Sequence, residues 1–400
     1  MTTARCNVTD LIDWILAEGC DSDDLGAILG GLIERFVAQG IPLRRVNLSM
    51  PTIDPTTTVI SFRWSLDEGL SSVALGLAES AGASFQRSPI HYLLERDVFR
   101  ARWKLEDPQV VQQFELFTEL RTQDMTEYAL RIVPFSKSRT ALQGAVLSLV
   151  TDRPGGFIDS EIDAIDRVLP ALGVVAYRMG LSRVATETLG AYLGPRTGAR
   201  VMQGMIRRGD SQVISAALLL ADLRGFTALA DRAPATDVVG WLNQHLECIG
   251  DAVTAQGGEI LKFLGDGLLA IFPSEQIGAE RACSAALRAA VDAGTRNAAL
   301  NTRRTAEGGP TLDLSIALHF GDVVYGNIGT ARRLDFTIVG PAVNEVSRME
   351  VLGKALGREL VLSQSVADRC GHKVISLGAH ELRGIAGRRE MYTVMPDATG

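Results

Sequence analysis

Apolar residues in the first 180 positions change between helical and strand-like spacing. After Ser22, apolar residues recur every three or four positions until Gly40, which predicts a helix capped by Ser22. Ser160, followed three positions later by Asp163, predicts the start of a long amphipathic helix. Between these helices, strand-like runs lie at 45–50, 57–64, 128–134 and 144–151, with a polar and mainly helical stretch at 88–121. The pattern predicts an α+β domain.

The second half of the chain predicts strands and helices in the order β-α-β-β-α-β. An apolar strand at 213–223 precedes a helix that starts near Pro234, and the tripeptide 265–267 (Gly-Asp-Gly) turns one strand into the next. The other expected elements are helices at 279–292 and 341–356 and strands at 259–264, 268–272, 312–320, 323–328 and 334–339. This alternation is typical of a ferredoxin-like α+β sheet, which we expect helices to cover on one face.

A joint at residues 181–212 separates the two halves. It contains Pro195, several glycines and the pair Arg207-Arg208. This composition is compatible with a solvated linker and with a short helix that couples the two halves. We therefore expect an N-terminal domain at 1–180, the joint, and a C-terminal domain at 213–395.

Charge and composition exclude several classes of function. A formal net charge of −7 argues against a general binder of nucleic acid or of anionic membranes, because both require an excess of Lys and Arg. No run approaches the ~20 apolar residues that cross a bilayer, so we expect no membrane span. The five cysteines are scattered and form no C-x-x-C pair, which favours a cytoplasmic location over a disulfide framework.

Two aspartates lie in apolar settings 44 residues apart. Asp222 ends the strand at 213–223, and Asp266 occupies the turn at 265–267. A carboxylate at the end of an apolar strand is costly unless it is paired or binds a metal, and Mg²⁺ favours one or two carboxylates together with substrate phosphates. The simpler alternative is that Asp222 caps the following turn and Asp266 is an ordinary hairpin residue.

Two further groups of residues are suited to a phosphorylated ligand. Gly225, followed by Phe226 and Thr227, can turn backbone N–H groups toward an anion. Asn344 and Arg348 are four positions apart on an expected helix and so share a face. Arginine can neutralise charge on a phosphoryl group and asparagine can hydrogen-bond a ribose. The alternative for this pair is a polar surface stripe.

Residues 213–395 resemble the catalytic domain of class III nucleotidyl cyclases. The resemblance is carried, in order, by ADLRGFTAL, GGEILKFLGDGLLAIF, ALHFGDVVYGNIG, DFTIVGPAVNEVSRME and ELRGI. GGEI also resembles the motif of diguanylate cyclases, but the order of the other motifs fits class III better.

The resemblance implies a role for each candidate residue. Asp222 and Asp266 correspond to the aspartates that bind two Mg²⁺ or Mn²⁺ ions, with Leu223 counted among the metal-binding residues. Lys262 corresponds to the adenine-selecting lysine, and Thr337 lies where one adenylate cyclase subgroup has threonine. The remaining implied roles are ribose orientation by Asn344, transition-state stabilisation by Arg348, and phosphate binding by Gly225, Phe226 and Thr227.

One family residue has no direct counterpart. A lysine near the C-terminus usually reaches the terminal phosphates, but the matching segment ELRGIAGRREMY contains no lysine. Its arginines are Arg383, Arg388 and Arg389, of which we take Arg383 as the substrate-binding candidate.

Together these features predict an adenylate cyclase that converts ATP to 3′,5′-cyclic AMP and pyrophosphate. The resemblance implies a head-to-tail homodimer, in which the metal ligands come from one subunit and Lys262, Thr337, Asn344 and Arg348 from the other. The N-terminal half resembles a GAF-type sensor in its order of elements, with a PAS-like or unrelated α+β domain as alternatives, and its regulator is an unknown small molecule or protein. Two other readings of the whole chain stay open, a guanylate cyclase and a nucleotide-sensing module without catalysis.

Overall fold

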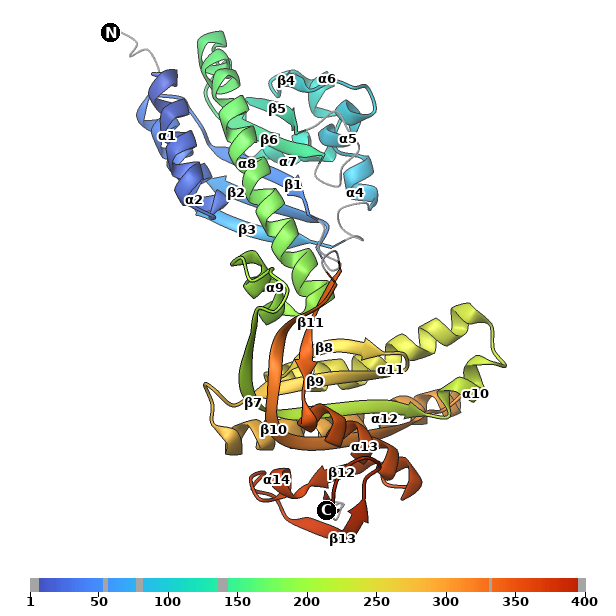
Figure 1. Cartoon of the computed structure of the whole chain (residues 1–400). Helices are drawn as coiled ribbons and strands as arrows, with labels where there is room; N and C mark the ends of the chain where they lie inside the picture. Colours follow the sequence, from blue (N-terminus) through green and yellow to red (C-terminus); the bar gives the residue numbers. More distant parts are fainter. Residues whose placement is uncertain (1–6, 53–56, 77–81, 136–142, 331–332, 395–400) are drawn as a thin grey trace. The chain divides into compact units, whose positions relative to one another are not determined.

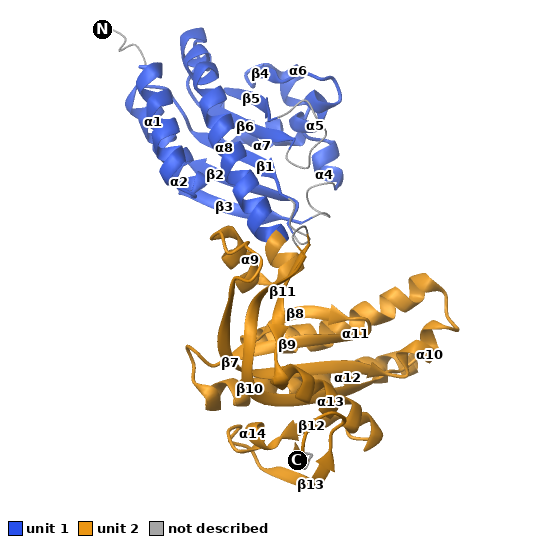
Figure 2. Ribbon diagram, in the orientation of Figure 1, with its two compact units in different colours: residues 1–188 blue, residues 189–400 orange. Residues whose placement is uncertain are grey.

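The computed structural model describes residues 7–52, 57–76, 82–135, 143–330 and 333–394. The chain divides into two compact units, Met1–Thr188 and Leu189–Gly400 (Figure 2). The long helix α8 (Asp159–Leu193) continues past that boundary and therefore covers the start of the expected joint. The rest of the joint contains a second helix, α9 (Pro195–Met202).

Unit 1 is built on a six-stranded antiparallel sheet with the order β3-β2-β1-β6-β5-β4 (Figure 1). Its strands are β1 (Arg45–Pro51), β2 (Val59–Ser65), β3 (Gly69–Leu75), β4 (Arg100–Lys104), β5 (Glu127–Pro134) and β6 (Gly144–Thr151). Its other helices are α1 (Val8–Asp21), α2 (Leu25–Ala38), α4 (Ala83–Gln86), α5 (Pro89–Leu94), α6 (Pro108–Val111) and α7 (Glu115–Thr122). The strands expected from the sequence are present, and the α+β character of this half is confirmed.

Alternation along the strands of unit 1 builds a core on each face of the sheet. In β5, Ala129 faces the core that α1, α2 and α8 cover, whereas Tyr128 and Leu130 face a second, aromatic core with Phe117. Successive residues of a strand point to opposite faces, so a run of apolar residues such as β5 supplies both cores at once.

Several local expectations for unit 1 were wrong. Asp24, not Ser22, caps α2, because its side chain accepts from the Ala27 N–H, and Ser22 instead ends α1. Neither α1 nor β3 was expected. The stretch at 88–121 contains strand β4 between its helices, and β4 has few apolar residues because it forms an edge of the sheet.

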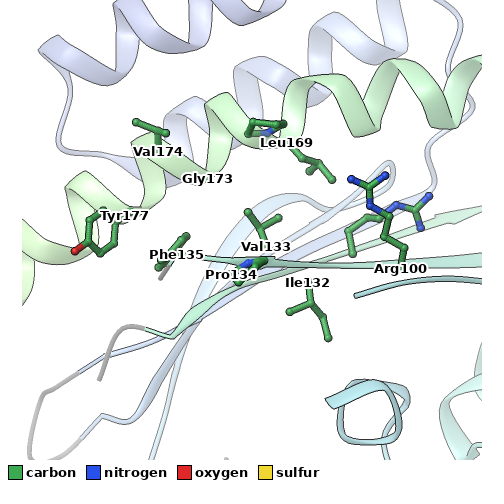
Figure 3. Close-up of a pocket in the computed structure, with 11 residues that line it drawn as sticks. Arg100, Ile132, Val133, Pro134, Phe135, Leu169, Gly173, Val174 and Tyr177 are labelled. Atoms are coloured by element: carbon green, nitrogen blue, oxygen red, sulfur yellow. The ribbon is translucent and has the colours of Figure 1, made fainter. Parts of the chain in front are cut away.

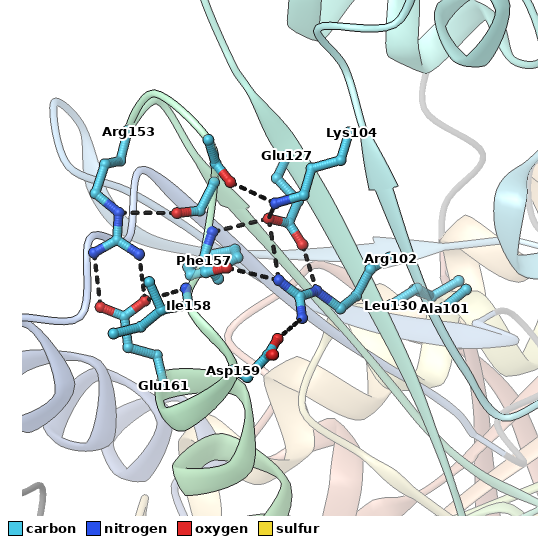
Figure 4. Close-up of polar contacts among 12 residues, drawn as sticks. Ala101, Arg102, Lys104, Glu127, Leu130, Arg153, Phe157, Ile158, Asp159 and Glu161 are labelled. Carbon is cyan, nitrogen blue, oxygen red and sulfur yellow. Dashed lines mark hydrogen bonds and ion pairs between the residues drawn. The ribbon is translucent and has the colours of Figure 1, made fainter.

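A buried glutamate fastens the start of α8 to the sheet (Figure 4). Glu127 is fully buried and accepts from Arg102 Nε at 2.6 Å, from Lys104 Nζ at 2.6 Å and from the Phe157 N–H at 2.8 Å. Burial alone would raise the pKa of Glu127, but the three donors outweigh it and hold the pKa below its usual value. Arg102 also pairs with Asp159, the first residue of α8, at 2.9 Å.

Helix α8 also forms one wall of a cavity of about 370 Å³ in unit 1. The opposite side is formed by Val133 in β5 and by Phe135, which follows the strand (Figure 3). The buried Arg131 lies at this cavity and pairs with Asp166 at 2.6 Å.

Among the described residues, α8 alone is long and apolar enough to cross a membrane by length and composition. This finding qualifies the expectation that no segment is apolar enough to cross a membrane. Half of the most apolar stretch of α8 is buried inside the structure, as in the core helix of a soluble protein, so length and composition indicate a span only weakly.

Unit 2 contains an eight-stranded sheet with the order β13-β14-β12-β10-β7-β9-β8, and β11 pairs with β10. The strands are β7 (Ser211–Arg224), β8 (Glu259–Leu264), β9 (Gly267–Pro273), β10 (Asp313–Gly329), β11 (Leu334–Val339), β12 (Leu360–Ser363), β13 (Val374–Glu381) and β14 (Arg388–Val394). The helices besides α9 are α10 (Phe226–Ala230), α11 (Ala235–Ala255), α12 (Ala279–Ala306), α13 (Pro341–Ala355) and α14 (Gln364–Ala367).

The central elements β7, α11, β8, β9, α12 and β10 confirm the expected βαββαβ order. In space the four strands lie in the order β10-β7-β9-β8, so β7 and β10, the first and last of the four in sequence, pair with each other. Their pairing is antiparallel throughout.

Three expectations for unit 2 were wrong. The two strands expected at 312–320 and 323–328 are one strand, β10, because its pairing with β7 continues through Gly321 and Asp322. Helix α12 extends to Ala306 rather than ending near residue 292. Helices cover both faces of the sheet, with α11 and α12 on one face and α13 on the other, where Val346 and Met349 pack on β7 and β10.

Candidate functional site

Two aspartates meet at one end of β7 and β9. Asp222 lies near the end of β7, and Asp266 lies in the turn just before β9. A Cβ on Gly267 would lie 2.4 Å from the Ala221 carbonyl oxygen and 2.9 Å from Asp222 Oδ1. Glycine is therefore required at 267, and this close approach brings the neighbouring Asp266 against Asp222.

The proximity of the two carboxylates affects their electrostatics. Burial, and next the negative charge of Asp222, raise the pKa of Asp266 above its usual value. The ammonium group of Lys354, near the end of α13, pairs with Asp222 and lies 3.1 Å from Glu350 Oε1. Burial opposes the charge on Lys354, but these two carboxylates outweigh it and raise its pKa.

This donor set fits a divalent cation that is shared with a phosphorylated ligand. Two carboxylates at close range repel each other, and a bound cation removes that repulsion. The described residues contain no cluster of three or more His, Cys, Asp and Glu suited to a metal, so a cage made by protein alone is not supported. Mg²⁺ commonly takes one or two carboxylates with waters and phosphates. The side chain of Leu223 is buried in the core, so that residue could reach a cation only through its backbone.

A second polar group lies on β8 and β11. The pairing of β8 with β9 shifts by one residue between Ile260 and Lys262, which is a β-bulge. The bulge places Lys262 opposite Leu269, on the face that α13 covers. Lys262 Nζ lies 3.3 Å from Asp335 in β11.

Thr337 lies two residues beyond Asp335 and so shares its face of β11. Thr337 is 4% exposed, and its hydroxyl has no hydrogen-bond partner within the described part of the chain. A buried hydroxyl without a partner loses its hydration without compensation, which makes it a candidate contact for a ligand.

The remaining candidates lie at the surface. Asn344 and Arg348 are exposed on α13, and no hydrogen bond or ion pair joins either side chain to another described residue. Arg383 is exposed between β13 and β14, whereas Arg389 lies 3.6 Å from Glu345. Gly225 has a φ of +75°, in the left-handed region that glycine favours, and precedes the exposed or half-buried Phe226 and Thr227 of α10.

Comparison with known proteins relates unit 2 to adenylate and guanylate cyclases. Residues 210–396 match the family model described as the adenylate and guanylate cyclase catalytic domain. An adenylate cyclase from Anabaena cylindrica is 32% identical over 149 residues, covering 37% of this chain and 29% of that protein. Adenylate cyclase 1 from Rhizobium meliloti (strain 1021) is 29% identical over 182 residues, covering 44% of this chain and 27% of that protein. Residues 210–396 form a cyclase catalytic domain.

Solved cyclase structures also resemble the chain. The adenylyl cyclase CyaB from P. aeruginosa is 24% identical with a TM-score of 0.44, covering 48% of this chain and 98% of that chain. The guanylyl cyclase Cya2 is 27% identical with a TM-score of 0.40, with the same two coverages. The chain spans less than a third of the length of the two curated relatives above.

Within the cyclase domain, the candidate residues fall into separate groups. Asp222 pairs with Ser315 of β10, whereas Thr337 pairs with Gly326, eleven residues further along the same strand. Eleven residues are about 36 Å of extended strand when measured along the chain. No hydrogen bond or ion pair between described residues joins the aspartate pair to Lys262 or Thr337.

Sequence reasoning missed Lys354 and Asp335. The spacing of Glu350 and Lys354 is that of a helical ion pair, which the sequence could have indicated. The contact of Lys354 with Asp222 joins residues 132 positions apart and depends on how α13 packs against β7. No pattern in the sequence marks the bulge that turns Lys262 toward Asp335.

Proposed function

We propose that the chain converts ATP to 3′,5′-cyclic AMP and pyrophosphate, as an adenylate cyclase of the threonine-containing subgroup. The observation that carries the proposal is the buried Thr337 hydroxyl, unpartnered within the described chain, on the same strand face as the residue to which Lys262 donates. An ammonium group can donate to N1 of adenine, and a hydroxyl can accept from its exocyclic amine. Guanine presents an N–H and a carbonyl at these positions, so the pair favours ATP.

The triphosphate end of the site is assigned to the aspartate pair. Asp222 and Asp266 would hold two Mg²⁺ or Mn²⁺ ions, which neutralise the phosphates and make the ribose 3′-hydroxyl more acidic. Asn344 orients the ribose so that the 3′-oxygen can attack the α-phosphorus in line with the departing pyrophosphate. Arg348 neutralises the charge that develops on the phosphoryl group. The other assigned phosphate contacts are the backbone N–H groups of Gly225, Phe226 and Thr227 and the side chain of Arg383.

We also propose that two copies of the chain complete each site. Asp222 in β7 and Thr337 in β11 pair with β10 at positions eleven residues apart. The side chains of Asn344 and Arg348 are exposed and have no partner in the described part of their own chain. A head-to-tail homodimer would bring the aspartates of one copy to the base-reading and ribose-binding residues of the other, which gives two equivalent sites.

Unit 1 is proposed to be a GAF-like regulatory domain, with a PAS-like domain as the alternative. Its six-stranded antiparallel sheet has helices on both faces, and its last helix continues into the segment before the cyclase domain. A small molecule or a protein that binds unit 1 could therefore act on the next unit through α8.

The test is formation of cyclic nucleotide by the purified full-length chain with Mg²⁺ or Mn²⁺, with ATP and GTP offered separately. We expect cyclic AMP from ATP. Arg348→Ala should lower kcat by about 100- to 1,000-fold with little change in KM, because the arginine acts on transition-state charge. The matched control is Arg281→Ala, an exposed arginine on α12, which should behave as wild type.

Three results would contradict this proposal. Preferred formation of cyclic GMP would support a guanylate cyclase. ATP binding without product, unchanged by Asp222→Asn, would support a nucleotide-sensing module. A change confined to KM in Arg348→Ala would contradict the role given to Arg348.

A further inference from the structure

A buried glutamate in unit 2 is held by neutral groups. Glu259, the first residue of β8, is 3% exposed. One carboxylate oxygen accepts from the N–H and the hydroxyl of Thr197, each at 3.0 Å. The other accepts from the Tyr325 hydroxyl at 3.3 Å. Described Lys and Arg side chains form no ion pair with Glu259. A buried carboxylate without a cation is costly, so its hydrogen bonds must hold it closely.

These hydrogen bonds join three segments that are distant in sequence. Thr197 lies in the first turn of α9, Glu259 begins β8, and Tyr325 lies in β10. A Cβ on Gly194 would lie 3.1 Å from Glu259 Oε1, so the start of α9 packs directly on the carboxylate. We call Thr197, Glu259 and Tyr325 the α9 latch.

Two further contacts hold the segment around α9 on β10. The Arg200 guanidinium lies over the Tyr325 ring, 4.8 Å from its centre. The Asn327 side chain donates to the Met205 carbonyl oxygen at 2.8 Å. Thr197 and Arg200 of α9, together with Met205 just after it, therefore hold this segment against β10 and the start of β8.

The α9 latch lies near Lys262 and Thr337, the two residues proposed to recognise the base. On β8, the bulge puts Lys262 on the same face of the sheet as Glu259, three positions away. On β10, the Tyr325 ring packs edge-on against Phe336, with ring centres 4.8 Å apart, and Phe336 directly precedes Thr337 in β11. A shift of Glu259 relative to Tyr325 would therefore change the spacing of Lys262 and Thr337.

We propose that the α9 latch is a positioning device that sets the spacing of Lys262 and Thr337 and so the preference of the cyclase domain for adenine. The inference rests on the proposed function. Thr197, Glu259 and Tyr325 act through Lys262 and Thr337 and do not touch the nucleotide. It follows that the joint between the two units contributes to substrate selectivity.

The test uses Thr197→Val and Tyr325→Phe in the full-length chain. Each removes one hydroxyl and keeps nearly the same shape. Thr197→Ser, which keeps the hydroxyl, is the rescue variant. Tyr392→Phe, which removes a tyrosine hydroxyl bonded to Gln364, is the matched control. For each variant, kcat/KM is measured for ATP and for GTP, and amide hydrogen exchange is followed across 195–205.

We expect Thr197→Val and Tyr325→Phe to speed amide exchange in α9 by about three- to tenfold, the equivalent of one lost hydrogen bond. The ratio of kcat/KM for ATP over GTP should fall by a similar factor, and Thr197→Ser and Tyr392→Phe should match wild type. A general loss of stability would lower kcat/KM equally for ATP and for GTP and leave the ratio of the two values unchanged. A change in the ratio is therefore specific to positioning.

Two results would overturn the proposal. Unchanged exchange would mean that the hydroxyls do not hold α9. Faster exchange with an unchanged ratio would mean that α9 does not position the base-reading pair. A wild-type chain that cyclises neither nucleotide would instead contradict the proposed function. In that case the exchange data and the relative binding of ATP and GTP still decide whether the latch acts.

Discussion

Each unit buries a glutamate at the first residue of a strand, and the two are held in opposite ways. Glu127 in β5 is bound by Arg102, Lys104 and one backbone N–H. Glu259 in β8 is bound by two hydroxyls and one backbone N–H. A carboxylate balanced by two cationic side chains is a structural anchor, because removing its negative charge leaves both cations unpaired. A carboxylate balanced by neutral donors contributes less to stability, so its role is better sought in what it positions.

The largest expected effect is on the stability of unit 1. Glu127→Gln should lower its free energy of unfolding by about 3 kcal/mol, because Arg102 and Lys104 would lose their shared partner near the start of α8. Urea unfolding, followed by a probe within unit 1, would measure this loss. The control is Asp67→Asn, which breaks an exposed pair with Arg44 and should cost at most about 1 kcal/mol. Equal losses in the two variants would contradict the role of Glu127 as an anchor.

The same substitution in unit 2 should have a smaller effect. Glu259→Gln keeps one carbonyl oxygen that can accept from Thr197, and its amide can donate to the Tyr325 hydroxyl oxygen. We therefore expect a loss of about 1–2 kcal/mol in the free energy of unfolding of unit 2. Urea unfolding with a probe in unit 2 would measure it. A loss as large as that of Glu127→Gln would show that the two glutamates do not differ as the structure indicates.

The two units should also differ in how acid affects their stability, because unit 2 contains a buried histidine. His245 is fully buried, with Nδ1 2.5 Å from Asn297 Oδ1 and Nε2 3.1 Å from an Arg304 nitrogen. Burial, together with the nearby positive charge of Arg304, lowers the pKa of His245 below its usual value of 6.5. The neutral form is therefore favoured by folding, and its stabilisation is present above pH 6.5 and lost as pH falls through the lower folded pKa.

The corresponding change in unit 1 comes at lower pH. The pKa of Glu127 is held below 4.5, so its stabilisation is present above pH 4.5 and lost as pH falls through the folded pKa. Unfolding at a series of pH values should thus show unit 2 weakening first. His245→Gln, which can still donate and accept, should flatten the pH dependence of unit 2 below pH 6.5. An unchanged slope would exclude His245 as its cause.

Local patterns in the sequence predicted the βαββαβ elements of unit 2 well, whereas α10, β12, α14, β13 and β14 were not expected. Apolar strands, the turn at 265–267 and the helix that carries Asn344 and Arg348 depend mainly on neighbouring residues, so the βαββαβ order followed from spacing. The long strand β10 was divided in error at Gly321 and Asp322, because these residues usually mark turns. Pairing with β7 along the whole strand outweighs that local preference.

The candidate site was predictable as a set of residues, and its geometry was not. The motifs marked Asp222 and Asp266, and close packing at Gly267 brings the two together. The pairing of Lys354 with Asp222 and of Lys262 with Asp335 could not be read from the chain. Each depends on register or on helix packing between residues more than 70 positions apart.

By itself, the sequence determined that the first half mixes helices and strands, that the second half follows a βαββαβ order from β7 to β10, and which residue types suit nucleotide chemistry. These follow from periodicity and from the chemistry of single side chains. Only the tertiary structure decided that a bulge turns Lys262 toward β11, that Thr337 buries an unpartnered hydroxyl within the described chain, and that Glu259 ties α9 to the sheet. The physical reason is that burial and hydrogen bonding between distant segments depend on how strands pair and helices pack, which no local pattern encodes.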